Sequence, residues 1–314
     1  MIVPYRGFGR GNELLIRGRV LVEKRIAPAV EGERVWRSVL NAWRRFESDE
    51  LPGVTVRAAY RDAVVETVTN DEGHFQTLLA PQVIDAERLW HEVDLSLPDR
   101  NVTVPGHVMV PPVHAEFGII SDIDDTIVQT GATNFVTMIR SVMQNARARL
   151  PFEGVGDLYA ALHRGVNPLF YVSSSPWNLY DVLDEYKALN GIPPGPMFLQ
   201  DFGWDDDTFI HDKHDVHKLR EIGTILDYYP SLPFVLIGDS GQHDPEIYLR
   251  VIQGHAGRVK AVFIRDVTED IRDKAVAAIG REAEAAGVPM HYVTTSAQAL
   301  DIARQMGLTV EKGV

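Results

Sequence analysis

Three aspartates that directly follow an apolar run, Asp122, Asp124 and Asp125, are the residues in this sequence best placed for chemistry. The run itself, residues 117–121, reads Phe-Gly-Ile-Ile-Ser and has the pattern of a buried strand. Side chains at i and i+2 of an extended segment share a face, so Asp122 and Asp124 should converge at the strand's carboxyl end, where open α/β sheets place ligands. Oxygen ligands suit a hard cation such as Mg²⁺, which usually also holds a substrate phosphate. The alternative is an aspartate-rich turn that caps the next helix.

Two later apolar runs also end in polar side chains. Residues 169–172 lead into the hydroxyls of Ser173 and Ser174, which can donate hydrogen bonds to phosphate oxygens. Residues 234–238 lead into Asp239, with Asp244 five positions later. If these runs are neighbouring parallel strands, their polar ends should meet at one edge of the sheet.

A lysine precedes the last of these runs. Lys218 begins a segment in which Leu219, Ile222, Ile225 and Leu226 recur at helical spacing, so we expect it at the start of a helix. Lysine is a common partner of phosphate. Lys213, which also precedes the run, is interpreted as a solvated charge in a loop.

The order of these groups resembles the four motifs of the haloacid dehalogenase superfamily of phosphotransferases. The chain has Asp122-x-Asp124-x-Thr126, then a strand-end serine, then a lysine, then Gly238-Asp239 with Asp244. Within that superfamily it is similar to the actin-patch-associated phosphatidate phosphatase catalytic-domain family. That similarity is carried by Ser-Asp-Ile-Asp-Asp-Thr-Ile at 121–127, Tyr-Val-Ser-Ser-Ser-Pro-Trp-Asn-Leu-Tyr at 171–180 and Ile-Gly-Asp-Ser-Gly-Gln-His-Asp-Pro-Glu-Ile-Tyr at 237–248. It extends over about residues 114–270.

The resemblance implies a role for each matching residue. Asp122 would be the nucleophile that forms an aspartyl-phosphate, and Asp124 the general acid and base. Mg²⁺ would lie between the Asp122 carboxylate, the Asp124 backbone carbonyl and Asp239, supported by Asp244. Lys218 and a serine would bind the substrate phosphate. Ser173 is the favoured serine, and Ser174, on the opposite face of the strand, stays open.

The elements that must position these residues follow from the pattern of strands and helices. Residues 114–314 alternate strand and helix, which predicts a doubly wound parallel sheet with a short helical insertion at about 130–155. The resemblance implies that this sheet is of the haloacid dehalogenase type. Residues 1–113 predict a separate, smaller domain with strands at 14–22, 54–58 and 63–68. Its turn at 69–75, in which Gly73 should need a positive φ, resembles the β-sandwiches of transthyretin-like and carboxypeptidase-regulatory domains.

Composition limits the function classes. The chain has 314 residues, enough for two domains, and no cysteine, which excludes disulfides and thiolate chemistry. A formal net charge of −13 argues against nucleic acid as a partner. The amino-terminal residues lack the apolar core of a signal peptide, and no stretch has the length of a membrane span, so a cytoplasmic location is expected.

Two other polar clusters have less specific patterns. His211, His214 and His217 lie three residues apart and could suggest a transition-metal site, but a polar loop and helix start is the preferred interpretation. Asp205–Asp207 are interpreted as a solvated loop near the rim of the site.

The site residues predict a magnesium-dependent phosphomonoesterase, and the resemblance implies that its substrate is phosphatidate or a related lipid phosphate. Such an enzyme must contact a membrane surface peripherally, and the amphipathic segments 33–46 and 132–150 are the candidates, although either could pack on its own domain instead. The alternatives are a phosphatase of a soluble metabolite, which the acidic charge favours, and an inert phosphatase-like scaffold. The oligomeric state and the role of the amino-terminal domain are left open.

Overall fold

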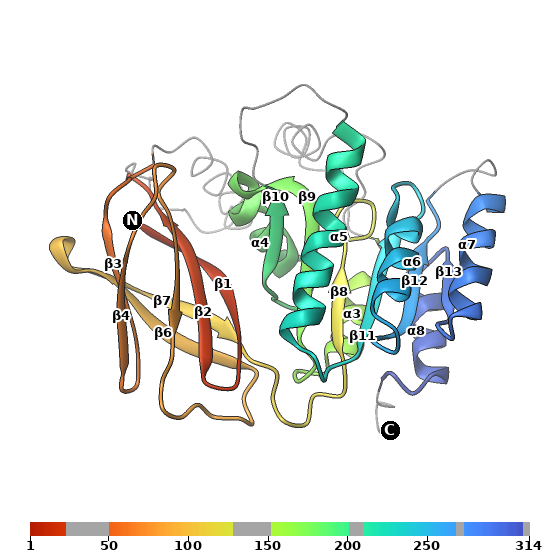
Figure 1. The fold of residues 1–314 in the computed structure, drawn as a ribbon, viewed down its shortest axis with the longest axis horizontal. Helices are drawn as coiled ribbons and strands as arrows, with labels where there is room; N and C mark the ends of the chain where they lie inside the picture. Colours follow the sequence, from red (N-terminus) through yellow and green to blue (C-terminus); the bar gives the residue numbers. More distant parts are fainter. Residues whose placement is uncertain (23–49, 128–151, 201–209, 268–272, 310–314) are drawn as a thin grey trace, which may run out of the picture. The chain divides into compact units, whose positions relative to one another are not determined.

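The computed structural model of the protein describes residues 1–22, 50–127, 152–200, 210–267 and 273–309 (Figure 1). These residues pack into two units. The first comprises Met1–Ala115 and Asn178–Leu189, and the second Glu116–Trp177 and Asn190–Val314. Segments 33–46 and 132–150, most of the insertion expected at 130–155, and Asp205–Asp207 lie outside the described residues. None of the described helices is both long and apolar enough to cross a membrane.

The first unit is built on a seven-stranded sheet in the part of the chain that the structure describes. Its strand order is β4-β3-β6-β7-β1-β2-β5, and neighbours are antiparallel except for the β1–β7 pair. Thr67 of edge strand β4 donates a hydrogen bond to the carbonyl of Gln76 in the other edge strand, β5, at 3.5 Å, so the two edges approach each other. The likeness to a two-sheet sandwich stays a prediction. The strands are β1 (Ile2–Arg10), β2 (Glu13–Val20), β3 (Thr55–Tyr60), β4 (Ala63–Val68), β5 (His74–Leu79), β6 (Trp90–Leu97) and β7 (Val102–Met109).

The segment 97–113 contains four prolines, which argue against regular structure, yet part of it forms a strand. It contains the 3-10 turn η1 (Pro98–Arg100) and the whole of β7. Proline cannot donate a ladder hydrogen bond, yet Pro105 lies opposite Asp94 of β6. The strand tolerates it because β1 pairs with β7 only at Val108 and Met109, which leaves the other side of Pro105 unpaired.

The turn before β5 has the conformation that its sequence predicts. Gly73 adopts a φ of +71°, which glycine reaches without strain. The Asn70 side chain accepts hydrogen bonds from the backbone N–H groups of Glu72 and His74, at 3.1 and 2.8 Å. This side chain replaces a backbone acceptor, as turn asparagines commonly do.

One helix, α4 (Tyr180–Leu189), also belongs to the first unit, although it follows a strand of the second along the chain. Arg6 of β1 forms two side-chain hydrogen bonds with Asp184, both 3.1 Å long, and its backbone N–H donates to the Tyr180 hydroxyl at 2.6 Å. Lys187 is 1% exposed and lies 3.4 Å from Asp184. A buried lysine of this kind is held by its acidic partner.

The second unit is a six-stranded parallel sheet within the described residues, in the order β10-β9-β8-β11-β12-β13. The first strand along the chain, β8 (Gly118–Ser121), is central, with β9 (Leu169–Pro176) on one side and β11 (Phe234–Asp239) on the other. The order of strands therefore reverses at β8, and such a switch point is where open α/β sheets bind ligands. The remaining strands are β10 (Met197–Gln200), β12 (Val259–Arg265) and β13 (Met290–Val293).

The two central strands β8 and β11 are largely apolar rather than alternating. Every residue of β8 and β11 is buried, as expected for parallel strands covered on both faces. The helices form two groups: α3 packs with α8, whereas α5, α6 and α7 pack in sequence (Figure 1). Their bounds are α3 (Val155–His163), α5 (Ile210–Tyr228), α6 (Asp244–Gly254), α7 (Asp273–Ala285) and α8 (Ser296–Gln305), with the 3-10 turn η2 (Trp177–Leu179) after β9.

Candidate active site

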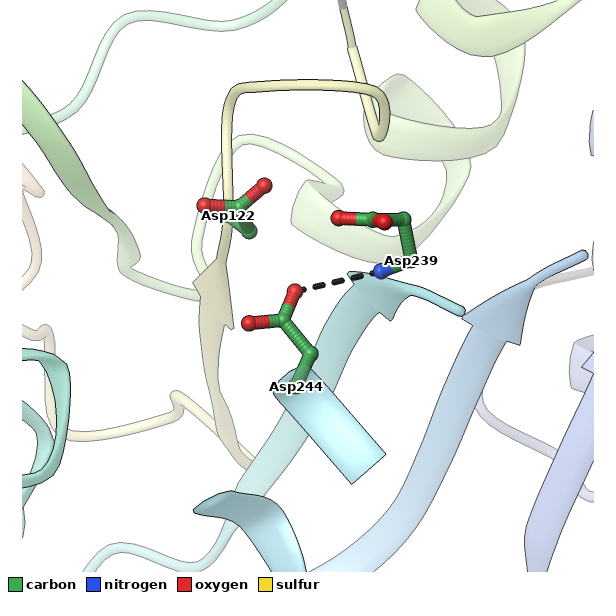
Figure 2. Close-up of side chains that lie close together, drawn as sticks. All are labelled: Asp122, Asp239 and Asp244. Atoms are coloured by element: carbon green, nitrogen blue, oxygen red, sulfur yellow. Dashed lines mark hydrogen bonds between the residues drawn. The ribbon is translucent and has the colours of Figure 1, made fainter. Parts of the chain in front are cut away.

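Three aspartates from two neighbouring strands and a helix meet at the switch point. Asp122 follows β8, Asp239 ends β11 and Asp244 begins α6. One carboxylate oxygen from each lies within 4.8 Å of the others, and all three residues are buried (Figure 2). Among the described residues no other group of three acidic or histidine side chains is this compact. The structure thus brings these three predicted site residues to one point.

Asp244 links two other groups of the cluster through hydrogen bonds. Its Oδ2 accepts a hydrogen bond from the backbone N–H of Asp239 at 3.1 Å, the bond drawn in Figure 2. Its Oδ1 accepts one from the Lys218 ammonium group at 2.8 Å. Gly238 makes this arrangement possible, because a Cβ atom there would lie 2.4 Å from Asp244 Oδ2.

Lys218 links two of the carboxylates. It lies in α5, is 4% exposed, and its Nζ is 2.8 Å from both Asp122 Oδ1 and Asp244 Oδ1. Burial lowers the pKa of Lys218, but the charges of Asp122 and Asp244 more than offset that and raise it above its usual value. Lys218 is therefore a permanent cation at this point.

The cluster contains two buried carboxylate oxygens without a partner. Oδ2 of Asp122 and Oδ2 of Asp239 accept no hydrogen bond from any described residue. The other oxygen of Asp239 accepts from the backbone N–H groups of Gly241 and Gln242, at 2.7 and 2.9 Å. Buried polar atoms normally have partners, so two unsatisfied acceptors this close together fit a bound cation.

The pKa values of the cluster also indicate a deficit of positive charge. Burial raises the pKa of Asp122 well above its usual range, and the Asp244 charge adds to this while Lys218 opposes it. Burial and Asp244 raise the pKa of Asp239 to about 7. Three carboxylates facing one ammonium group leave an excess of negative charge that a divalent cation would neutralise. The oxygen-only donor set suits a hard ion.

Asp124 belongs to the same loop but its carboxylate has a different environment. Its Oδ2 accepts hydrogen bonds from the hydroxyls of Ser173 and Ser175, at 2.9 and 3.3 Å. Burial raises the pKa of Asp124, and the hydrogen bond from Ser173 partly offsets this. Asp124 is thus placed beside the cluster, with its side chain turned toward β9. The next residue, Asp125, adopts a φ of +54°, which aspartate tolerates better than most residues.

The serine that could meet a phosphate is distinguished by its contacts. Ser173 is fully buried, and its hydroxyl donates to Asp124 and accepts from the backbone N–H of Ser175 at 2.9 Å. The buried Ser174 hydroxyl has no hydrogen-bond partner among the described residues. Both serines remain candidates, and the structure shows that only Ser174 has an uncommitted hydroxyl.

Three residues of the site are given no function by the sequence prediction: Gln242, Ser175 and Gly238. Gln242 accepts from Lys218 at 3.2 Å and donates to the Asp124 backbone carbonyl at 3.4 Å. Ser175 and Gly238 each belong to a motif of the sequence, but neither has an assigned function there. Ser175 has a sequence signal, because it lies two positions from Ser173 in an extended segment. Gln242 has none, since its contacts depend on how a loop folds back.

The histidine pattern of α5 does not lead to a metal site in the part of α5 that the structure describes. His217 is buried beside Arg220, with its Nδ1 3.3 Å from the arginine, and is 3.9 Å from Glu221. Burial lowers the pKa of His217. The side chains of His211 and Lys213 lie outside the described residues.

Comparison with known families supports the predicted resemblance. Residues 117–266, slightly less than half of the chain, match the family described as "Phosphatidate phosphatase APP1, catalytic domain". All three cluster aspartates, Asp124 and Lys218 lie inside this range. The resemblance predicted for this segment is thereby confirmed.

Two curated fungal proteins are similar to the same part of the chain. The phosphatidate phosphatase APP1 of Saccharomyces cerevisiae is 35% identical over 158 residues, which cover 50% of this chain and 27% of the yeast protein. A protein of Schizosaccharomyces pombe is 28% identical over 154 residues, covering 48% of this chain and 25% of that protein. The match therefore spans about a quarter of the length of these relatives.

Among solved structures, a hydrolase of the haloacid dehalogenase family from Deinococcus radiodurans, with bound phosphate and sodium, aligns with the chain. It is 15% identical, and the alignment covers 62% of this chain and 99% of that one. The TM-score is 0.34, so this similarity supports no conclusion about the site.

Proposed function

We propose that the protein is a magnesium-dependent phosphomonoesterase that works through an aspartyl-phosphate on Asp122. The observation that carries the proposal is the buried cluster of Asp122, Asp239 and Asp244, with Lys218 2.8 Å from two of its members. The family match of residues 117–266 supports the reaction class. Asp122, Asp239 and the backbone carbonyl of Asp124 would hold Mg²⁺, which supplies positive charge that keeps Asp122 ionised and offsets the charge of the phosphate.

Asp122 is the nucleophile in this proposal. Its carboxylate attacks phosphorus, a bond to the ester oxygen breaks, and the phosphoryl group is carried on Asp122 until water releases it. Lys218 holds one oxygen of Asp122 and so fixes the orientation of the carboxylate. The same ammonium charge attracts the substrate phosphate, which would otherwise be repelled by the carboxylates.

Asp124 acts as the general acid and base. Burial raises the pKa of Asp124 and so favours the protonated form, and this proton passes to the leaving oxygen as the ester bond breaks. The ionised carboxylate then removes a proton from the water that hydrolyses the aspartyl-phosphate. Ser174, with its uncommitted hydroxyl, donates a hydrogen bond to the phosphate, or Ser173 does so by giving up its hydrogen bond to Asp124.

The substrate that we propose is phosphatidate or a related lipid phosphate, because the curated yeast relative is a phosphatidate phosphatase. An enzyme with this substrate contacts membranes peripherally. A soluble phosphate ester is the second candidate, favoured by the net charge of −13, which disfavours approach to an anionic lipid surface. Comparing hydrolysis of phosphatidate in detergent micelles with hydrolysis of soluble alkyl phosphates separates the two.

The test of the mechanism is the Asp122→Asn variant. We expect this isosteric change to lower the rate of hydrolysis of p-nitrophenyl phosphate in Mg²⁺ by more than about 10³-fold, because the amide cannot serve as the nucleophile. Wild-type protein should also lose activity in a chelator and become labelled by substrate phosphate, and the variant should not be labelled. The control is Asp301→Asn, an exposed position in α8 that pairs with Arg304. Equal activity of wild type and Asp122→Asn would refute the proposal.

A further inference from the structure

Two serine hydroxyls converge on a single oxygen of Asp124. Ser173 donates to Asp124 Oδ2 at 2.9 Å and Ser175 donates to the same atom at 3.3 Å. Both serines are buried, with exposed fractions of 0% and 7%. They lie two positions apart in β9, so their side chains share one face of the strand and reach the same neighbour.

We infer that Ser175, together with Ser173, is a positioning residue that holds the Asp124 carboxyl group in the orientation needed to protonate the leaving oxygen. This inference rests on the function proposed above and assigns Ser175 a part in it. An oxygen of a carboxyl group accepts hydrogen bonds through two lone pairs, and two hydroxyl donors occupy both of them on Oδ2. The proton of the acid form is therefore carried by Oδ1, to which no described residue donates.

The geometry of β9 makes this arrangement rigid. The Ser173 hydroxyl accepts the backbone N–H of Ser175 at 2.9 Å, so its own hydrogen is directed to Asp124. Ser121, the residue before Asp122, is fixed in a similar way, since its hydroxyl donates to the Asp122 carbonyl at 2.6 Å and shares a hydrogen bond with Tyr159. The carboxyl group of Asp124 and the loop that carries it are thus held from two sides. This orientation matters because a general acid must lie within hydrogen-bond reach of the oxygen that it protonates.

Leaving-group dependence distinguishes an orienting role from a structural one. An alkyl phosphate needs its leaving oxygen protonated, whereas p-nitrophenolate leaves without a proton. Loss of a group that orients the acid should therefore reduce kcat/KM for the alkyl ester much more than for the aryl ester. Loss of a group that only supports the fold, or only binds phosphate, should reduce both equally.

The experiment compares kcat/KM for an alkyl phosphate and for p-nitrophenyl phosphate, with Mg²⁺, in the full chain. For Ser175→Ala we expect a fall of about 10-fold with the alkyl ester and less than about 3-fold with the aryl ester, as part of the 10²–10⁴-fold that a general acid contributes. Ser175→Thr, which keeps the hydroxyl, should restore the wild-type ratio. Asp124→Asn should change the ratio in the same direction and further. Thr224→Ala, which removes an exposed hydroxyl of α5 bonded to the Arg220 carbonyl, should leave it unchanged.

The outcomes separate this inference from the proposed function. An equal fall with both esters in Ser175→Ala, or no fall, would overturn the inference while leaving the mechanism intact. A wild-type protein that hydrolyses neither ester, or whose Asp122→Asn variant is fully active, would overturn the proposed function instead. If Ser175→Ala does not fold, Ser173→Ala gives the same test: a larger loss with the alkyl ester supports the contact with Asp124, and an equal loss contradicts it.

Discussion

Replacing Gly238 by alanine would place a methyl group inside the carboxylate cluster. The added Cβ would lie 2.4 Å from Asp244 Oδ2, 2.8 Å from its Cβ and 2.9 Å from its Cγ. Gly238 is not among the glycines with positive φ, so the backbone accepts alanine and only the contact is unfavourable. Asp244 starts α6 and is buried together with Pro245 and Ile247, so it can move only by giving up its hydrogen bonds.

The expected cost follows from those bonds. Overpacking of a buried site costs about 1–3 kcal/mol. Displacing Asp244 also weakens its bonds with Lys218 and with the N–H of Asp239, and hydrogen bonds to charged groups contribute about 1.5–3 kcal/mol each. Partial relaxation keeps these terms from adding fully. We expect a loss of about 3 kcal/mol in the free energy of unfolding and a large loss of phosphatase activity.

Urea denaturation followed by circular dichroism, with chelator and again with Mg²⁺, measures this effect. The matched control is Gly254→Ala at the end of α6, where an added Cβ would meet nothing within 4 Å. That change should be neutral or stabilise by up to about 1 kcal/mol. Combining Gly238→Ala with Asp244→Gly removes the clashing atoms, so the double variant should lose less free energy of unfolding than the two single variants lose together. A Gly238→Ala protein within about 0.5 kcal/mol of wild type, and active, would refute the steric reasoning.

Two further predictions concern buried lysines. Lys218→Met should lower the free energy of unfolding, measured by urea denaturation in chelator at pH 8, by about 3–5 kcal/mol, because it leaves buried carboxylates without their cation. The control Lys260→Met, at an exposed position, should change it by less than about 0.5 kcal/mol. A similarly small change for Lys218→Met would contradict the ion pairs of Lys218. Burial lowers the pKa of Lys187 from 10.5 to about 8, with Asp184 opposing the shift. Between pH 8 and 10.5 Lys187 is therefore protonated in the unfolded chain but largely neutral in the folded one. The contribution of Lys187 to the free energy of unfolding then rises with pH through that window. The difference in stability between wild type and Lys187→Met should therefore shift in favour of wild type by up to about 3 kcal/mol from pH 8 to 10.5, and a difference that does not vary with pH would exclude this effect.

Two of the three cluster acids, Asp122 and Asp239, could be found from the sequence because each directly follows an apolar run. Asp122 and Asp239 lie at the ends of adjacent parallel strands, and the pairing of Ile237 with Ser121 places them side by side. Strand-end position is a local property that can be recognised without the fold.

Other features depend on contacts between distant segments and could not be found in this way. The hydrogen bond from Gln242 to the Asp124 carbonyl joins residues 118 positions apart. Pro105 argues against a strand at β7, and only the limited pairing with β1 explains why the proline is tolerated there. The need for glycine at 238 becomes visible only when the Asp244 side chain is in place.

The grouping of α4 with the amino-terminal sheet has a consequence for the modularity of the chain. This helix lies within the range that matches the catalytic-domain family, yet Arg6 of β1 pairs with its Asp184. A fragment cut at residue 115 would remove the Tyr5 ring from Tyr180 and leave Asp184 without Arg6. Relatives that carry the catalytic segment on a different scaffold must shield that surface by other means, so we expect the sequence of this helix to change together with whatever domain accompanies it.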